Sequence, residues 1–131
     1  MSDAVLTGTP RRREALQWFA LGAAPLAWAV ELVLGFGVTQ AACNAAGHRW
    51  TIRTDAWEIG LMAAAASVVL VAEAAAIVLL RALREVGDSD PPPTGRQHFF
   101  ATAAVVGNVL FLVIILLSGV GAVYLPYCQQ S

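Results

Sequence analysis

The stretch FFATAAVVGNVLFLVIILLSGVGAVYL, from Phe99 to Leu125, contains no charged residue. A helix rises about 1.5 Å per residue, so about 20 apolar residues cross the ~30 Å hydrocarbon core of a bilayer. Inside lipid a segment must pair its own backbone groups, so an apolar run of this length is a helix and not a strand. The stretch therefore predicts a transmembrane helix.

Two further apolar runs precede this one. The first, Ala15 to Ala42, is interrupted by Gln17 and Glu31, and the second, Trp57 to Leu80, by Glu58 and Glu73. We therefore expect an all-α integral membrane protein with three transmembrane helices, at about residues 15–42, 56–83 and 98–125. These form one domain over residues 14–128, with tails at residues 1–13 and 129–131.

The composition of the chain supports this class. Of 131 residues, 58% are hydrophobic and only 13% are charged, whereas soluble domains carry roughly 25% charged residues. A single small core cannot bury so much apolar surface. The net charge is −1 and lysine is absent, which argues against nucleic acid as a partner. A soluble enzyme and a disordered chain are disfavoured as well, and membrane lipids are the expected surroundings.

The arginines predict the orientation in the membrane. Six lie in the N-terminal segment and between the second and third runs, and two lie between the first and second: Arg11, Arg12, Arg13, Arg81, Arg84 and Arg96 against Arg49 and Arg53. The positive-inside rule places the N-terminus in the cytoplasm and the C-terminus outside. We expect a multi-pass protein of the bacterial inner membrane. Arg12-Arg13 and Ala41-Ala42-Cys43 vaguely suggest a cleaved signal, but the first run is too long for a signal peptide.

The two cysteines, Cys43 and Cys128, follow the first and third runs. The predicted orientation places both at the outer surface, which in a bacterium is the oxidising side. A disulfide that ties the outer ends of these helices is therefore the leading interpretation. Two free thiols are the main alternative. Metal or redox chemistry ranks third, because the cysteines of a redox motif normally lie close together in sequence and these lie far apart.

Three polar residues lie deep in the apolar runs, namely Glu31, Glu73 and Asn108. Counted from the inner ends of their helices, Glu31 lies ~24 Å deep, Glu73 ~12 Å and Asn108 ~14 Å. Glu73 and Asn108 therefore share a level and can hydrogen-bond, whereas Glu31 lies further out. Each glutamate is either a protonated hydrogen-bond partner within a bundle or a proton-relay residue. Glu58 is expected at the outer interface, in contact with water.

Small residues recur at four-residue spacing, for example Gly60 with Ala64 and Ala72 with Ala76. Such pairs let transmembrane helices approach closely. Three helices need only part of this surface for their own bundle, so the surplus favours contacts with a neighbouring protein, although a general bias toward alanine explains it as well. Pro25 is expected to kink the first helix.

Sites for chemistry are scarce in the sequence. His48 and His98 are expected on opposite sides of the membrane, so they cannot ligate one haem together, and no C-x-x-C-H motif is present. Two cysteines are too few for a closed zinc site. We therefore expect no catalytic residue, no cofactor and no metal ligand in this chain.

The first run opens with Gly22-Ala23-Ala24-Pro25-Leu26-Ala27-Trp28 and ends at Cys43, with Cys128 after the third run. In these features the chain resembles a loose group of small three-span bacterial membrane proteins whose genes often lie beside those of haem–copper cytochrome c oxidases. The resemblance implies an accessory or assembly subunit of a respiratory oxidase. It carries over no catalytic residue.

The leading hypothesis is a non-catalytic accessory or stabilising subunit of a larger bacterial membrane complex, with a respiratory terminal oxidase as the specific candidate. Other integral membrane subunits would be its partners. The alternative is a small homo-oligomeric proton-coupled transporter that uses Glu31 or Glu73. A holin-like pore ranks third, because few polar residues align on one helix face.

Overall fold

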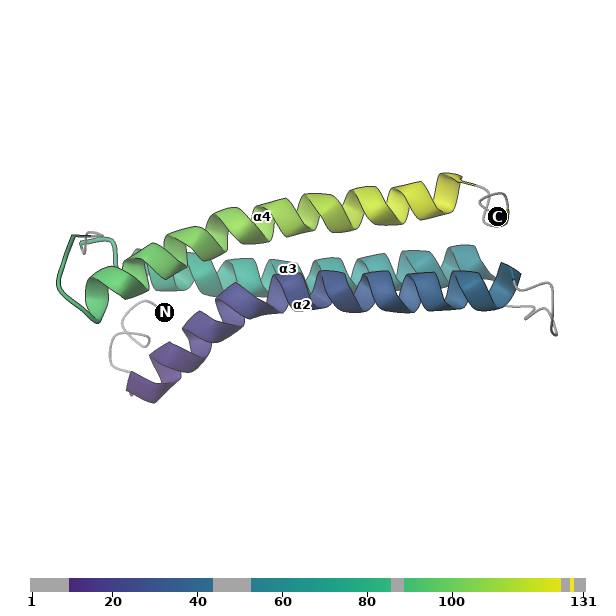
Figure 1. Ribbon diagram of the computed structural model, residues 1–131. Coiled ribbons are helices and arrows are strands. Elements are labelled where there is room, and N and C mark those ends of the chain that lie inside the picture. The colour runs from purple at the N-terminus through teal and green to yellow at the C-terminus, as the bar shows by residue number, and fades with distance from the viewer. Residues whose placement is uncertain (1–9, 44–52, 86–88, 126–127, 129–131) are drawn as a thin grey trace.

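The computed structural model describes residues 10–43, 53–85, 89–125 and 128. They form three long α-helices, α2 (Pro10–Cys43), α3 (Thr54–Ala82) and α4 (Thr94–Tyr124). The helices run side by side along one common direction, and each is antiparallel to the next (Figure 1). Each is long and apolar enough to cross a membrane. The described residues contain no β-strand, so the predicted all-helical class is confirmed.

All three helices begin earlier than the sequence predicts, α3 by only two residues, at Thr54. Helix α2 begins at Pro10 and α4 at Thr94, so part of the predicted N-terminal tail and of the predicted loop before the third span is helical. Thr94 donates a hydrogen bond from its hydroxyl to the carbonyl of Pro91 where α4 begins. The prediction counted apolar residues alone, whereas a helix continues through polar residues where the apolar segment meets water. Residues 1–9 and 129–131 of the predicted tails, His48 and Arg49 lie outside the described residues.

Small side chains line the interface of the bundle. The interior positions are spaced by three or four residues, or by about twice that, on each helix, as expected for one face of a helix. They are Gln17, Ala20, Ala24, Glu31 and Gly35 on α2, Glu58, Ala65, Val69, Ala72, Ala76 and Leu79 on α3, and Gly95, Ala101, Ala104, Asn108, Ile115 and Gly119 on α4. Most of these residues are alanine or glycine, which lets the helix backbones approach closely.

The large apolar side chains face away from the bundle. Leu26 and Leu117 are each about two-thirds exposed, at 66% and 67%, and many other leucine, valine and isoleucine side chains share this orientation. In water such a surface would aggregate. In a bilayer the lipid tails are as apolar as leucine. Small residues inside the bundle and large apolar residues outside it are therefore the arrangement expected of a membrane protein.

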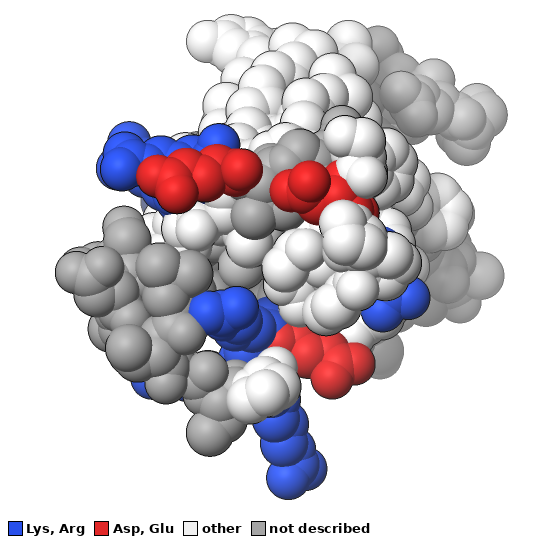
Figure 2. All heavy atoms as spheres, turned by 90° about the vertical axis from the view of Figure 1, so that its left-hand side faces the viewer, with Lys and Arg blue, Asp and Glu red and all other residues white. Residues whose placement is uncertain are grey.

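Charged residues gather at the two ends of the bundle. The end that holds the start of α2 and the connection from α3 to α4 carries clustered arginine and acidic side chains (Figure 2). Its arginines are Arg11, Arg12, Arg13, Arg81, Arg84 and Arg96, while Arg53 lies at the start of α3, at the opposite end. The first part of α2 leans away from the other two helices (Figure 1). Pro25 is the proline inside this helix, and the missing hydrogen bond of a proline is the usual cause of a bend.

Candidate functional site

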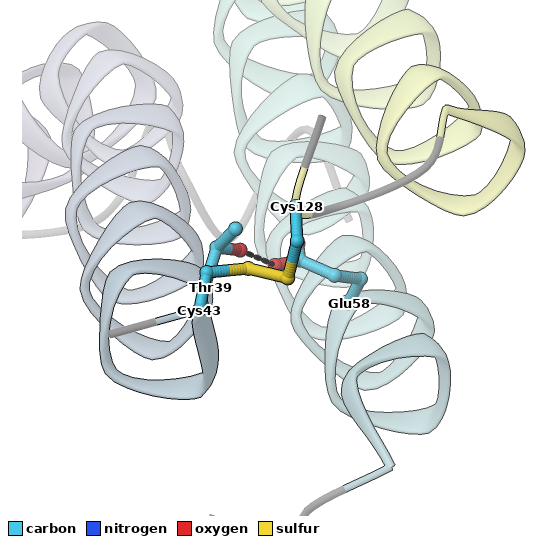
Figure 3. The surroundings of a disulfide bond; sticks show 4 residues. All are labelled: Thr39, Cys43, Glu58 and Cys128. Atoms are coloured by element: carbon cyan, nitrogen blue, oxygen red, sulfur yellow. Dashed lines mark hydrogen bonds between the residues drawn. A yellow bond between two sulfur atoms is a disulfide. The ribbon is translucent and has the colours of Figure 1, made fainter. Parts of the chain in front are cut away.

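A disulfide between Cys43 and Cys128 closes the end of the bundle opposite the arginine cluster. The two Cα atoms lie 5.5 Å apart and the residues are separated by 85 positions in sequence. Figure 3 shows the bond beside the last turn of α2. The bridge ties α2 to the segment that follows α4. The described residues include both cysteines, and neither is free.

Glu58 lies one turn into α3, directly beneath this end. The sequence placed it at the interface and in contact with water, but only 7% of its surface is exposed, so that expectation is wrong. The hydroxyl of Thr39 on α2 donates a hydrogen bond to Oε1 of Glu58 at 3.4 Å (Figure 3). Depth along the helix says how far a residue lies from water, but only the helix face decides burial, and Glu58 shares its face with Ala65 and Val69.

Gly35 on α2 makes room for this carboxylate. A Cβ atom at position 35 would lie 3.0 Å from Oε2 of Glu58, which is tighter than ordinary van der Waals contact. A side chain at position 35 would therefore require the Glu58 carboxylate to shift by a few tenths of an ångström. Gly35 lets the carboxylate approach α2 closely, and Thr39, one turn away, binds it.

Glu31 joins the same cluster from two turns further down α2. It is 5% exposed, and its Oε2 atom has no hydrogen-bond partner among the described residues. Glu31, Thr39 and Glu58 line one groove of about 400 Å³, which runs between α2 and α4. Ser118 and Gly121 form part of the α4 wall. We call this feature the outer groove, where outer means toward the disulfide end of the bundle and inner means toward the arginine-rich end.

An apolar layer closes the bundle on the inner side of the outer groove. It is built on Ala24, Ala65, Val69 and Ile115, all buried. Trp28 and Phe111 pack against this layer and contact each other, with ring centroids 5.8 Å apart. Along the helices this layer separates Glu31 and Glu58 from Glu73 and Asn108.

Glu73 and Asn108 lie between this layer and a second one, formed by Ala20, Ala76 and Ala104. The sequence predicted that the two residues share a level, and their positions along α3 and α4 agree. The described residues contain no hydrogen bond between them. Oε2 of Glu73 and Nδ2 of Asn108 have no partner there, although Asn108 is only 2% exposed. The hydrogen bond that the sequence analysis allowed between them is therefore not formed among the described residues.

A second groove, of about 620 Å³, lies on the surface between α2 and α3. Its walls are apolar, and small residues form much of its length, among them Gly22, Ala23, Ala27, Ala64 and Ala65. Trp18 and Phe19 stand at one end and Glu31 at the other. We call this feature the lateral groove. It has no counterpart among the sequence predictions beyond the surplus of small residues.

Among the described residues, no group of three or more histidine, cysteine or acidic residues is placed to hold a metal ion. His98 lies in the first turns of α4, near the arginine-rich end. The chemistry that remains is that of two buried carboxylates and nearby hydroxyls in the outer groove, together with an apolar surface for packing.

Sequence reasoning found Glu31 but missed its partnership with Glu58. A usable signal was present: Glu31, Gly35 and Thr39 recur every four residues, and Glu58 is spaced by seven from Ala65. Both patterns place these residues on the interior faces of their helices.

Comparisons with protein-family models, with curated proteins and with solved structures gave no match for this chain.

Proposed function

We propose that this protein is a non-catalytic accessory subunit of a larger bacterial membrane complex, which it stabilises by packing against a helix of another subunit. The observation that carries this proposal is the lateral groove, a largely apolar surface groove between α2 and α3 whose lining includes five alanine and glycine residues. Within a bilayer no hydrophobic force drives helices together, so association depends on close packing at small residues. The lateral groove offers that surface, and the three helices do not use it themselves.

The arginine distribution supports the orientation that the proposal needs. The end with Arg11 to Arg13, Arg81, Arg84 and Arg96 would face the cytoplasm, by the positive-inside rule. The disulfide would then lie at the outer surface of the bacterial inner membrane, where disulfides persist. Charge and redox chemistry thus favour the same orientation.

A respiratory terminal oxidase is the complex we propose as partner. Support for an oxidase in particular comes from the resemblance of residues 22–28 and of the positions of Cys43 and Cys128 to small oxidase-associated membrane proteins. The geometry of the lateral groove supports a helix-binding subunit in general.

The test is purification of the tagged protein from native membranes in mild detergent, followed by mass spectrometry and a visible spectrum. We expect stoichiometric oxidase subunits with haem absorption. Ala64→Leu, which fills the lateral groove, should remove them, whereas Ala74→Leu, on an exposed part of α3 outside that groove, should not. A homo-oligomer without partner or pigment would contradict the proposal.

A second candidate is the small proton-coupled transporter. The unpartnered Oε2 atom of the buried Glu31 favours it. The apolar layer of Ala24, Val69 and Ile115 opposes it, because a proton path needs a chain of polar groups. If the protein is a transporter, Glu31→Gln or Glu73→Gln should abolish coupled uptake into proteoliposomes while the fold is kept. Wild-type behaviour of both variants would remove this candidate.

A further inference from the structure

The outer groove brings two buried carboxylates together without a basic side chain. Glu31 and Glu58 both line it, and none of its described lining residues is arginine or histidine. An ionised carboxylate in an apolar environment carries a large desolvation cost unless a positive charge compensates for it. The pair of side chains therefore needs a bound positive charge, from protons, from a cation, or from both.

The Glu31 carboxylate is the group that lacks a partner. Its Oε2 atom accepts no hydrogen bond from any described residue, although only 5% of the surface of Glu31 is exposed. Buried polar atoms in folded proteins nearly always have a partner, so an orphaned oxygen calls for a ligand. Glu31 shares its groove with the second carboxylate.

Two hydroxyl groups add oxygen ligands from the walls. Thr39 uses its proton to bond Oε1 of Glu58, which leaves lone pairs of its oxygen for another contact. Ser118 lines the opposite wall, on α4. The groove volume, about 400 Å³, leaves room for several waters at roughly 30 Å³ each.

From this arrangement we propose that the outer groove binds a monovalent inorganic cation, held by the carboxylates of Glu31 and Glu58 and by the hydroxyl of Thr39, with water completing its shell. Hard cations prefer oxygen ligands of this kind. Calcium sites typically take 6–8 oxygens, several of them from carboxylates and free backbone carbonyls, whereas the carbonyls of Glu31, Gly35 and Glu58 lie within α2 and α3, where helix hydrogen bonds engage them. One monovalent cation together with one proton would neutralise the pair.

The position of the site decides what such a cation does. The groove reaches Thr39 and Leu125, near the disulfide end of the bundle. On the other side, the layer of Ala24, Val69 and Ile115 blocks the interior. The cation therefore enters and leaves by one end, and it links α2 to α3 instead of crossing the membrane. Cation binding at this site does not depend on which partner complex the protein joins.

Carbodiimide labelling of the purified full-length protein tests the proposal, because N,N′-dicyclohexylcarbodiimide modifies protonated carboxyl groups in apolar surroundings. The reaction is run at one fixed pH in sodium chloride and in choline chloride of equal ionic strength. Peptide fragmentation in a mass spectrometer locates the label. We expect sodium at ten times its Kd to lower labelling of Glu31 and Glu58 about tenfold, because the bound cation replaces the proton of one carboxyl group and its presence in the groove shields the other, still protonated, carboxyl group from the reagent. Glu73 is the internal control, since it lies beyond the apolar layer, and its labelling should not change.

Three outcomes would overturn the proposal. Equal labelling of Glu31 and Glu58 in sodium and in choline means that protons alone neutralise the pair. Protection by calcium but not by sodium, potassium or lithium contradicts a monovalent site. Equal protection of Glu73 means that salt tightens the whole bundle and does not occupy the groove.

A pair of hydroxyl variants localises the ligand without removing a carboxylate. Thr39→Val keeps the shape of the side chain but loses its oxygen, so the sodium concentration needed for protection should rise about tenfold. Thr102→Val is the matched control, because that hydroxyl bonds the carbonyl of His98 within α4 and lies outside the groove. An unchanged sodium requirement in Thr39→Val would contradict the role of this hydroxyl.

Discussion

The helices pack differently in the two halves of the bundle, the inner half toward the arginine-rich end and the outer half toward the disulfide. In the inner half, Ala20, Ala76 and Ala104 meet directly, and the helices touch through methyl groups. In the outer half, α2 and α4 leave a groove in which Glu31 and Glu58 lie, and a disulfide holds the ends together. Direct contact between alanines holds the helices together in the inner half, although Gln17 and Asn108 are buried there as well. In the outer half, the covalent bond adds a restraint at the end where the groove separates α2 from α4.

The largest effect should follow from loss of that bond. In Cys43→Ser with Cys128→Ser, the loop of 85 residues is released, which in the chain-entropy model costs up to about 4–5 kcal/mol. The membrane already restrains the helices, so the loss in a bilayer should be smaller. Unfolding in mixed micelles measures it. Hydrogen exchange should rise near Thr39 and remain unchanged near Ala76, and a uniform rise along the helices would contradict the contrast between the halves.

Overpacking of the inner half should have the next largest effect. Ala76 is fully buried among alanines, so Ala76→Leu forces the helices apart at a cost of about 3 kcal/mol. Ala74→Leu is the control on the same helix, because Ala74 faces outward. Thermal unfolding in detergent compares the two variants. Equal stability of the two would mean that the inner half is not closely packed.

A glycine pair on α4 tests close contact within the outer half. A Cβ at Gly119 would overlap the side chain of Met62, whereas a Cβ at Gly107 meets nothing within 4 Å. Gly119→Ala should therefore cost about 1–2 kcal/mol, after allowance for the better helix propensity of alanine. Gly107→Ala should be neutral or stabilising. The same unfolding assay decides, and a reversed order of the two would reject the α3–α4 contact at Met62.

The smallest effect is expected at Asn108. Its amide nitrogen makes no hydrogen bond among the described residues, so Asn108→Ala removes a polar group without breaking a bond. The stability should change by less than about 1 kcal/mol. A loss of more than about 1 kcal/mol would instead indicate an interhelical hydrogen bond between Asn108 and Glu73, of the kind worth about 0.6–1.7 kcal/mol in membrane proteins. In that case, adding Glu73→Gln to Asn108→Ala would cost no further stability.

The sequence was sufficient for the fold because lipid leaves few choices. Long runs without charge, such as residues 99–125, have to be helices, and their number follows directly. The disulfide was predictable too, since the helix count places Cys43 and Cys128 at one end of the bundle. The helix ends were less predictable, because Pro10 and Thr94 begin helices in polar segments.

The candidate site was only half predictable. Depth along a helix follows from counting residues, and it correctly separated Glu31 from Glu73. The rotation of each helix about its axis depends on packing against its neighbours, so the inward orientation of Glu58 was missed. The absence of a bond between Glu73 and Asn108 is of the same kind, because a shared level does not fix where two side chains point.

Cysteine accessibility across the membrane tests the contrast between the halves most directly. The native cysteines are bonded to each other, so a single introduced cysteine is the reactive thiol. With a membrane-impermeant maleimide, Ser118→Cys in the outer groove should be labelled in spheroplasts but not in inverted vesicles, and Ala104→Cys in the alanine layer should be labelled in neither. Labelling of Ala104→Cys, or labelling of Ser118→Cys in inverted vesicles, would contradict the account, in which the outer groove is open only toward the disulfide end and the packed inner half excludes the reagent.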